Sequence, residues 1–404
     1  MKNALFLAWK SLRWHRGRSL TIIVSLAITI WLPVTVRLVL DQFRHEISAR
    51  ARMTPLVVGA RGSRIDLALH ALYFESLPPA GTTMAEVGHI EDSALGIAIP
   101  LHVRYRTLSR PGINGAVIVG TSPEYFEFRH LQVEYGEMLS LLGDCLIGAR
   151  LAERMNLQTG DSILSAPRNA FDLAGDYPLK LKITGVLKRT HSPDDDVVFT
   201  DVRTTWVIDG IGHGHQELTP KTDPNLLLKT NDSNSEDSST VTANAGVLPF
   251  TEITPENIGS FHFHGEPSSF PLTAVIVDPQ DDKSRIRILG RYASAQATAQ
   301  CLKPPEVIDE LLSIVFRIEQ LVWICSIAAV AVTGMLLALV LSLSMRLRES
   351  EMQTMFRLGC SRATIALLHS AEILLMLFAA VGLAAAGSWL TVAFGADSLR
   401  SLLF

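Results

Sequence analysis

The sequence predicts a membrane protein with three α-helical transmembrane spans and a large α+β extracytoplasmic domain inserted between the first span and the second. Three observations predict this class. Of the 404 residues, 48% are hydrophobic and only 19% are charged, and the mean hydropathy of +0.26 exceeds that of a typical soluble domain. The apolar residues concentrate in three long runs. Between the first run and the second lies a mixed stretch of about 270 residues, enough for a core of its own.

The three apolar runs are long enough to cross a bilayer as helices. They are Leu20–Val36, Leu321–Leu343 and Ile373–Phe394, and the last two contain no charged residue. At about 1.5 Å per residue, each run reaches roughly the 25–35 Å of a hydrocarbon core. Buried core helices are the alternative, but apolar runs beyond about 18 residues are rare in soluble domains. The first run also resembles a signal peptide, but no A-x-A site follows it, so we predict a retained span over residues 20–40.

Basic residues predict the orientation of the spans. Those before the first span are Lys2, Lys10, Arg13, Arg16 and Arg18, and those between the second and third are Arg346, Arg348, Arg357 and Arg362. Because lysine and arginine favour cytoplasmic segments, both groups are predicted to be cytoplasmic. Residues 41–320 and a short tail, 395–404, then lie outside the cytoplasm. We expect a multi-pass protein of the cell (inner) membrane with a cytoplasmic N-terminus.

Three further helices are predicted beside the spans. Residues 1–19 are expected to form a basic amphipathic helix at the membrane surface. Apolar residues in 305–320 recur at helical spacing, so this segment is expected to be a stalk helix that continues into the second span at 321–343. Residues 344–365 are expected to form a cytoplasmic helix before the third span at 373–394.

The outer domain, residues 41–304, has the pattern of mixed helices and strands. Short apolar or alternating stretches predict strands at 55–58, 116–119, 180–186 and 272–277. Helical patterns at 149–156 and 281–291 interleave with them without regular repeats, which favours an α+β fold. The polar residues 230–246 are expected to form a flexible linker.

The sequence contains none of the common catalytic motifs. It has no G-x-x-x-x-G-K-[ST], so it cannot cradle ATP phosphates in that way, and no H-E-x-x-H, G-x-S-x-G or C-x-x-C. Arg37 lies near the end of the first predicted span, where its side chain can reach the interface, and the predicted spans hold no buried acidic or basic residue of the kind that ion relays use. We therefore expect a chain that is not an enzyme. The net charge of −4 gives no basic excess for a nucleic-acid partner.

Two His-x-His motifs suggest a metal site. On a strand, residues two apart face the same way, so two such pairs can bring four imidazoles around Zn²⁺ or Cu²⁺. The alternative is two exposed loops that happen to contain histidine. The four residues are His213, His215, His262 and His264.

Two smaller features leave alternatives open. The run Asp194–Asp196 follows Pro193 and is expected to be a solvated turn, with a cation site as the alternative. Cys145 and Cys301 lie in the predicted outer domain, where they form either a disulfide or two free buried thiols.

The segment between the second and third runs carries a recognisable motif. It reads RESEMQTMFRLGCSR and is followed by a glutamate at the start of the third run. It resembles the FtsX/MacB-like permease family of ABC transporters, whose members show R-x-x-E-x-x-x-L-R-A-L-G-A-S-R and then a glutamate. The matching residues, which the resemblance implies to be ATPase coupling residues together with the apolar Phe356, are Arg348, Glu351, Met355, Arg357, Leu358, Gly359, Ser361, Arg362 and Glu372.

Three outer segments also resemble this family. They are IVGTSPEYF at 118–126, IGARLAERMNLQTGDSI at 147–163 and ITGVLKRTHSPDDDVVFTDV at 183–202. The resemblance therefore implies a MacB-type periplasmic core domain joined to an FtsX-like permease domain. The family usually has a fourth span, for which no apolar run follows Phe394. We expect either a naturally short protein or a truncated sequence.

The resemblance implies a function in transport. Family members are permeases, usually homodimers in the membrane lipid, that work with a dimer of separate cytoplasmic ATPase subunits, and ATP is bound by those subunits. ATP-driven movement of the extracytoplasmic domain exports or extracts a substrate, in some cases with a periplasmic adaptor. Two alternatives are open: a non-transporting regulator of an outer enzyme such as a cell-wall hydrolase, and a metal-related exporter or sensor that uses the His-x-His pairs.

Overall fold

The chain divides into two compact units, which we describe separately. Unit 1 comprises residues 1–49 and 309–404, and unit 2 comprises residues 50–308. The computed structural model describes residues 2–14, 16–75, 81–166, 178–214, 227–230, 241–243, 251–294, 296–347, 353–354, 356–357, 359 and 361–403.

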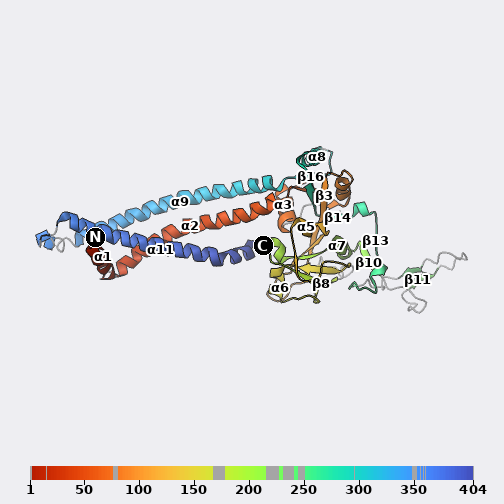
Figure 1. Cartoon of the computed structure of the whole chain (residues 1–404), viewed down its shortest axis with the longest axis horizontal. Coiled ribbons are helices and arrows are strands. Elements are labelled where there is room, and N and C mark those ends of the chain that lie inside the picture. Colours follow the sequence, from red (N-terminus) through yellow and green to blue (C-terminus); the bar gives the residue numbers. More distant parts are fainter. Residues whose placement is uncertain are drawn as a thin grey trace. The chain divides into compact units, whose positions relative to one another are not determined.

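Unit 1 is helical. Its helices are α1 (Lys2–Trp14), α2 (Arg16–Arg52), α9 (Pro304–Leu347) and α11 (Arg362–Leu403), and α2 and α9 extend by a few residues into unit 2. In this unit α2, α9 and α11 run alongside one another (Figure 1). The helix α9 is continuous across the predicted stalk and second span, and α11 continues through the predicted tail as far as Leu403.

Small and polar residues join the long helices of unit 1. The Thr29 hydroxyl lies 3.4 Å from that of Thr333, and the Thr35 hydroxyl lies 3.0 Å from that of Ser388. A side chain at Gly387 would come within 2.9 Å of the Trp31 ring, so glycine is needed for this close approach. Interhelical hydroxyl pairs and small residues are typical of helices that pack within a bilayer. Buried residues recur at every fourth position of α11: Glu372, Met376, Ala380, Ala384 and Ser388.

Within the described part of the chain, two helical stretches are long and apolar enough to cross a membrane. They are Ser19–Arg52, which contains the first predicted span, and Ala366–Ala393, which contains all but the last residue of the third. Within α9, a shorter apolar stretch covers Gln320–Leu336. Two helices thus fit the prediction by length and composition, and a count of three spans stays a prediction.

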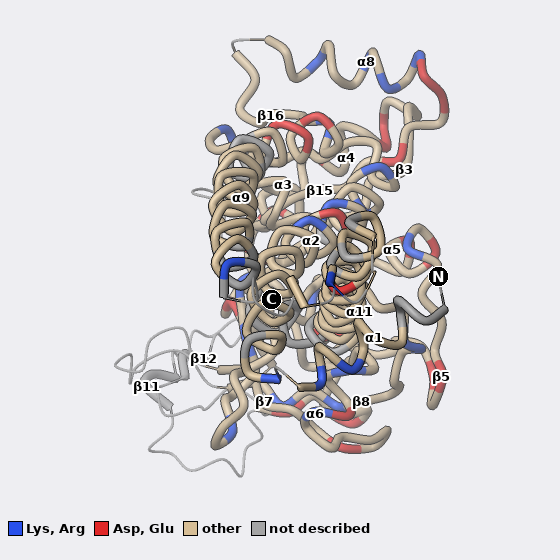
Figure 2. Tube along the Cα trace, turned by 90° about the vertical axis from the view of Figure 1, so that its left-hand side faces the viewer, with Lys and Arg blue, Asp and Glu red and all other residues tan. Residues whose placement is uncertain are grey.

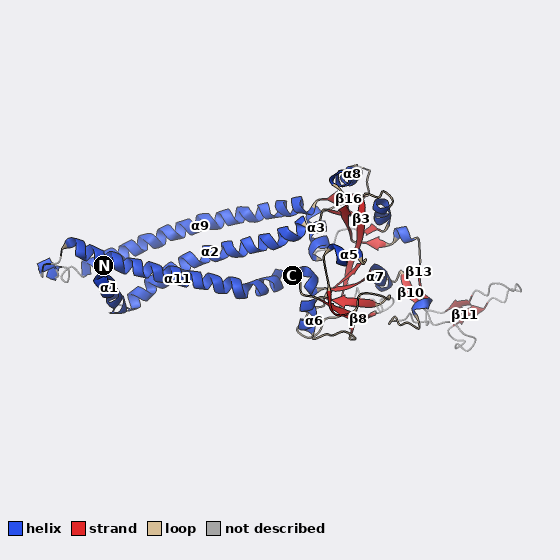
Figure 3. Cartoon of the chain, in the orientation of Figure 1, coloured by secondary structure: helices blue, strands red, loops and turns tan. Residues whose placement is uncertain are grey.

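Unit 2 is an α+β domain, as predicted, built on one mixed sheet (Figure 3). Among the described strands the order is β16-β1-β15-β3-β4-β9-β6-β8-β5, and β7 pairs with β8. Neighbours are antiparallel except for the parallel pairs β4–β9 and β6–β8. The strands are β1 (Leu56–Ala60), β3 (Gly96–Arg106), β4 (Val117–Thr121), β5 (Val133–Gly136), β6 (Asp144–Ile147), β7 (Ser162–Leu164), β8 (Lys180–Leu187), β9 (Val198–Asp201), β15 (Ala274–Pro279) and β16 (Ala299–Leu302).

Both faces of the sheet are buried. In β15, Ile276 contributes to one apolar cluster and Val275 and Val277 contribute to another. In β9, Phe199 and Val198 divide in the same way. A strand buried on both faces reads as a continuous apolar run, which explains the sequence LTAVIV at 272–277. The strands predicted at 55–58, 116–119, 180–186 and 272–277 all coincide with strands of this sheet.

Short helices and two-stranded sheets surround the main sheet. The helices are α3 (Arg64–Tyr73), α4 (Ala85–Glu91), α5 (Glu124–Phe128), α6 (Ala149–Met155), α7 (Val202–Ile208), α8 (Asp282–Tyr292) and the 3-10 turns η1 (Pro193–Asp196), η3 (Ile258–Ser260) and η4 (Pro267–Ser269). The strand pairs are β2 (Thr82–Thr83) with β14 (Pro271–Leu272), β10 (Gly212–Gly214) with β13 (Phe261–Phe263), and β11 (Leu227–Thr230) with β12 (Val241–Ala243). Of the predicted linker at 230–246, the structure describes Thr230 and residues 241–243, which lie in β11 and β12.

The helix α8 shows why its segment is helical. The Asp281 side chain caps it by accepting a hydrogen bond from the Ser284 amide at 2.6 Å. Ser284, Ile288 and Tyr292 are spaced by four and are buried, while Lys and Arg residues lie along the rest of the helix (Figure 2). The Tyr292 hydroxyl donates to Glu86 of α4 at 2.6 Å. The helix predicted at 281–291 is thereby held against the core.

The two predicted outer cysteines do not pair. Cys145 in β6 and Cys301 in β16 are both free thiols, and five strands lie between β6 and β16 in the sheet. Neighbouring strands are about 4.8 Å apart, so the two strands are separated by far more than a disulfide spans. Burial raises the pKa of the Cys145 thiol well above its ordinary value, and burial raises that of Cys301 to about 12. Of the two alternatives, free thiols are confirmed.

Candidate functional site

A buried ion pair lies where α2 ends in unit 2. Arg50, in the last turn of α2, donates from Nη1 to Asp194 Oδ2 at 2.6 Å and from Nη2 to Asp194 Oδ1 at 2.9 Å. Only 8% of Arg50 and 2% of Asp194 are exposed. Two parallel hydrogen bonds between guanidinium and carboxylate form the strongest common side-chain pair. The end of α2 is therefore tied to η1, a turn far away in the sequence.

Further donors complete the coordination of the Asp194 carboxylate. The Tyr125 hydroxyl donates to Oδ1 at 2.8 Å and the Ser192 hydroxyl donates to Oδ2 at 2.9 Å. Arg50 in turn donates from Nη2 to the Tyr125 oxygen at 3.0 Å and from Nε to the Leu72 carbonyl. Burying a charge is costly unless its polar atoms find hydrogen-bond partners. In this network each of the two Asp194 carboxylate oxygens accepts hydrogen bonds from two donors.

The pKa values of this network follow from burial and from the ion pair. Burial alone would raise the pKa of Asp194, but the charge and hydrogen bonds of Arg50 outweigh it and lower that pKa below its ordinary value. Burial would likewise lower the pKa of Arg50, but Asp194 raises it above its ordinary value. Burial, and then the Asp194 charge, raise the pKa of Tyr125. All three groups thus keep their ordinary charge states at neutral pH.

A second arginine holds the chain just after α2. Arg129 donates from Nη2 to the Thr54 hydroxyl at 2.9 Å, and Thr54 is fully buried. Its guanidinium lies 5.8 Å from the ring centre of Tyr125 and 4.9 Å from that of Phe128. Such stacking on aromatic rings stabilises a cation in a place that water reaches poorly. The junction between α2 and β1 is therefore fixed on two sides.

The prediction of a solvated turn at Asp194–Asp196 is wrong. Asp194 and Asp195 are both 2% exposed. Asp195 accepts from the Thr190 amide at 2.9 Å and from the His191 amide at 2.7 Å. Asp196 pairs with Arg150 at 3.2 Å and with Arg154 at 3.6 Å. The carboxylates of Asp194 and Asp195 therefore accept hydrogen bonds from protein groups, and Asp196 lies beside two arginines.

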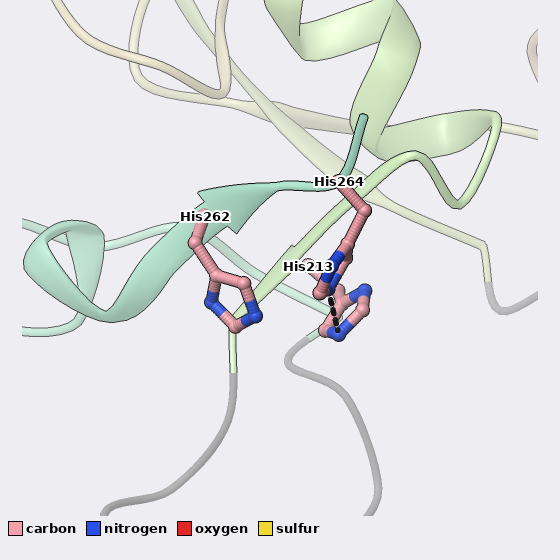
Figure 4. A group of neighbouring side chains, drawn as sticks. All are labelled: His213, His262 and His264. Carbon is pink, nitrogen blue, oxygen red and sulfur yellow. Dashed lines mark hydrogen bonds between the residues drawn. The ribbon is translucent and has the colours of Figure 1, made fainter. Parts of the chain in front are cut away.

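Three of the four predicted metal ligands lie together. His213 of β10 is paired in register with His262 of β13, and His264 follows β13 directly. Their ligand nitrogens all lie within 4.8 Å of one another (Figure 4). The fourth predicted ligand, His215, lies outside the described residues. These three residues are thus close enough to share an ion, and metal binding itself stays a prediction.

A comparison with models of protein families finds one family that matches this chain. The model of the MacB-like periplasmic core domain matches residues 19–243, which is more than half of the 404 residues. The chain belongs to this family. The prediction of an FtsX/MacB-like ABC transporter permease from sequence motifs is thereby confirmed.

Solved structures of MacB-like proteins are distantly similar to this chain. The extracellular domain of the noncanonical ABC-type transporter YknZ from Gram-positive bacteria is 11% identical, with coverage of 61% of this chain and 98% of that one and a TM-score of 0.33. The periplasmic region of MacB from Actinobacillus actinomycetemcomitans is 9% identical, with coverage of 65% and 95% and a TM-score of 0.35. Among curated proteins, sequence comparison finds no match.

The motif of this MacB-like permease between α9 and α11 is described in part. Residues 356 and 357 are helical, and Phe356 is 54% exposed. Glu372 is 5% exposed within α11. The predicted coupling residues Arg348, Glu351, Met355 and Leu358 lie outside the described residues, as does the side chain of Arg362. Their role stays a prediction.

The glycine and serine of this motif have clear structural roles. Gly359 has φ +93°, a left-handed conformation, and its amide donates to the Phe356 carbonyl at 3.0 Å. This is how glycine commonly ends a helix. Ser361 then accepts the Thr364 amide at 3.2 Å and caps the N-terminus of α11. The letters G-C-S of this MacB-like permease therefore encode a stop and a new helix start.

Removing either of these residues should loosen the turn. We expect Gly359→Ala to cost about 1 kcal/mol because alanine resists positive φ, and Ser361→Ala to cost a similar amount through loss of the cap. Limited proteolysis of the detergent-solubilised chain would detect this as faster cleavage between α9 and α11. Gly382→Ala, in the interior of α11 with nothing within 4 Å of the added carbon, is the matched control. Equal cleavage rates for all three variants would contradict the assignment.

The buried network was not found from the sequence of this MacB-like permease. Two of its residues, Tyr125 and Asp194, nevertheless lie in the segments 118–126 and 183–202, which resemble the family. Two features of the sequence could have indicated it. One is the acidic run after Pro193, in a segment that resembles the family, and the other is Arg50, which follows the predicted first span. Neither reveals that Arg50 and Asp194 meet.

Proposed function

We propose that this chain is the non-catalytic permease subunit of an ABC transporter and that a separate cytoplasmic ATPase drives movements of its extracytoplasmic domain. These movements export or extract a substrate on the outer side of the membrane. The observation that carries the proposal is the family match, which extends without a break from the first apolar helix into the core domain. The absence of a phosphate-binding motif in the sequence is consistent with ATP being bound by a partner.

The proposed topology has three spans. Residues 1–19 and 344–365 face the cytoplasm, and residues 41–320 face outward. Two apolar helices and the basic residues beside them support this arrangement. The proposed assembly contains two copies of the permease and two ATPase subunits, with a periplasmic adaptor or substrate protein at the outer domain.

The proposed route of transmission uses α2. This helix runs from Arg16 to Arg52 without a loop, and its last turn contains Arg50. The Arg50–Asp194 pair and the Arg129–Thr54 hydrogen bond support the route, because they attach the helix end to the core domain by buried, directional contacts. Displacement of a helix held in this way is passed to the domain rather than being absorbed by a flexible junction.

A charge reversal tests the ATPase contact. We expect the double variant Glu351→Lys, Arg357→Glu to lose most of its association with the ATPase subunit, because the proposal places both charges at the contact. The measurement is co-purification of the two subunits and stimulation of ATP hydrolysis in detergent or nanodiscs. Complementary buried charges at an interface typically change affinity by about 2–5 kcal/mol when one partner is removed.

The control for this experiment is Arg346→Glu. Arg346 is exposed in the last turn of α9 and lies outside the motif. Arg346→Glu reverses one basic charge in the same predicted cytoplasmic segment, 344–365, while the double variant leaves the net charge of that segment unchanged. Unaltered co-purification of Arg346→Glu would therefore show that the loss in the double variant depends on the two positions and not on the charge of the segment. Unchanged co-purification and ATPase stimulation in the double variant would refute the proposed contact.

A further inference from the structure

We propose that His213, His262 and His264 form a binding site for a transition-metal ion, Zn²⁺ or Cu²⁺, on the antiparallel strand pair β10–β13 of unit 2. The site lies outside the ion-pair network described above and does not depend on the transport function. It rests on strand register, on the packing that fixes the strand faces, and on the positions of the imidazole nitrogens.

The register of the β10–β13 strand pair brings the imidazoles to one face. β10 and β13 are antiparallel, with Gly212 opposite Phe263, His213 opposite His262 and Gly214 opposite Phe261. Side chains directly opposite each other in such a pair have Cβ atoms about 5 Å apart. His264 lies two residues after His262, so it returns to the same face. Its amide donates to the Ile211 carbonyl at 2.9 Å, which holds the backbone beyond the end of the strand.

Aromatic rings pack on the opposite face of the β10–β13 strand pair. Phe263 lies on the opposite face, with its ring centre 6.4 Å from that of Trp206 and 6.2 Å from that of Phe270. A side chain at Gly212 would come within 2.5 Å of the Phe263 ring, and one at Gly214 within 2.7 Å of the Phe261 ring. The sequences G-H-G and F-H-F are thus complementary: the rings fill the space over the glycines, and the histidines share the other face.

The three imidazole rings are close enough to bind one shared ion. The three ring centres are separated by 4.9 Å, 4.8 Å and 4.8 Å. Nε2 of His213 lies 3.3 Å from Nε2 of His264. Two nitrogens bound tetrahedrally to Zn²⁺ at about 2.0–2.1 Å would be separated by about 3.3–3.4 Å. A metal ion therefore fits between these two nitrogens without a change in their separation.

The backbone also selects the tautomer of His262. Its Nδ1 lies 3.2 Å from the Ser260 carbonyl oxygen, which can only accept a hydrogen bond. Nδ1 must therefore carry the proton in the neutral ring, so Nε2 is the nitrogen of this ring that can ligate a metal. Such an outer hydrogen bond to a carbonyl is the usual companion of a ligating histidine.

The donor set indicates the class of metal. Imidazoles suit Zn²⁺, Cu²⁺ and Ni²⁺ rather than Mg²⁺ or Ca²⁺, and Cu²⁺ binds most tightly to a given nitrogen site. Three neutral rings leave both positive charges of the ion uncompensated and a coordination position for water or an anionic ligand. His262 and His264 are exposed, so an ion reaches the site directly from solvent.

Metal titration of the full chain tests this site. The chain is purified in detergent with an affinity tag that contains no histidine, stripped with a chelator, and titrated separately with Cu²⁺ and Zn²⁺ against a competing indicator. We expect one tight equivalent per chain, imidazole nitrogen couplings in the Cu²⁺ spectrum by electron paramagnetic resonance, and a thermal midpoint that rises on metal addition. Because loss of an outer-shell partner alone costs about 10–100-fold in affinity, His262→Asn or His264→Asn should weaken binding by at least about 100-fold.

His130→Asn is the matched control. It removes one exposed histidine at φ +54°, a conformation that asparagine tolerates, and it lies outside the cluster. It should bind metal as the unaltered chain does. The proposal is overturned if no tight equivalent is found, or if His262→Asn and His264→Asn bind as tightly as His130→Asn. Thermal unfolding in chelator shows whether each variant remains folded, so a lost equivalent in a folded variant supports the site.

Discussion

Asp194→Asn is expected to destabilise unit 2 by about 3–5 kcal/mol at pH 7, the usual cost of removing one member of a buried ion pair. The substitution keeps the size of the side chain but removes the charge that balances Arg50, which is 8% exposed. It also puts an amide donor opposite the Arg50 guanidinium or the Tyr125 hydroxyl. Urea or thermal unfolding of the detergent-solubilised chain, followed through tertiary-structure signals, measures the loss.

The effect of Asp194→Asn should depend on pH in one direction. The pKa of Asp194 is lower in the folded chain than its ordinary value of 3.8. Its contribution is therefore complete above about pH 5, begins to fall as pH drops below the unfolded value, and is lost as pH passes through the folded value. The stability difference between the unaltered chain and the variant should be constant from pH 7 to about pH 5 and should shrink below about pH 4.

An exposed ion pair provides the control for Asp194→Asn. Asp282 lies 3.0 Å from Arg285, and its side chain is 85% exposed. Because exposed pairs contribute about 0–1 kcal/mol, Asp282→Asn should change stability very little. If the two variants were equally stable, the Arg50–Asp194 pair could not be the attachment of α2 that we propose.

Gly148→Ala is expected to cost at least about 1–3 kcal/mol, the range for overpacking a dense core. A Cβ at Gly148 would collide with the backbone of Asp194 and Asp195, where no flexible side chain can move aside. Gly148 is also fixed from both sides, since its amide donates to the Val197 carbonyl at 3.0 Å and its carbonyl accepts from Ala152 at 3.0 Å. Relief of the clash must displace η1 and with it the Asp194 carboxylate.

The variant Gly88→Ala is the matched control for Gly148→Ala. Gly88 lies inside α4, and an added Cβ meets nothing within 4 Å. Alanine in a helix interior is favoured over glycine by about 1 kcal/mol, so this variant should be as stable as the unaltered chain or more so. Gly148→Ala together with Asp194→Asn should cost less than the sum of the two, because both act on one carboxylate. A strictly additive result would count against the link between Gly148 and the ion pair.

Local periodicity predicted much of unit 2. The alternation of lysine with apolar residues in 180–186 identified β8, and the apolar run 272–277 identified β15, because strand and helix periods differ over a few residues. The two His-x-His motifs suggested a shared site with two exposed loops as the alternative, and His213, His262 and His264 lie close together on a pair of strands. These features depend on residues close in sequence or on one pairing of two short strands.

The buried ion pair was beyond prediction for the opposite reason. Arg50 and Asp194 are separated by 144 positions, and no repeat or spacing connects them. An acidic run after a proline is usually solvated. Burial is favourable here because Arg50 of α2 pairs with Asp194, and Arg150 and Arg154 of α6 pair with Asp196. Pairing in three dimensions thus reversed an expectation that composition alone supported.

The placement of β16 and β1 at one edge of the sheet determines how unit 2 responds to force. α2 ends shortly before β1, and α9 begins shortly after β16. Val57 and Leu302 are partners in this antiparallel pair, so both helices are attached at the same end of it. A force that drew the two helices apart would peel β16 from β1 one hydrogen bond at a time. A force that moved both helices together would instead be shared by all strands of the sheet. We therefore expect the domain to move as one body with the two helices, and to lose the β16–β1 hydrogen bonds first when the helices separate.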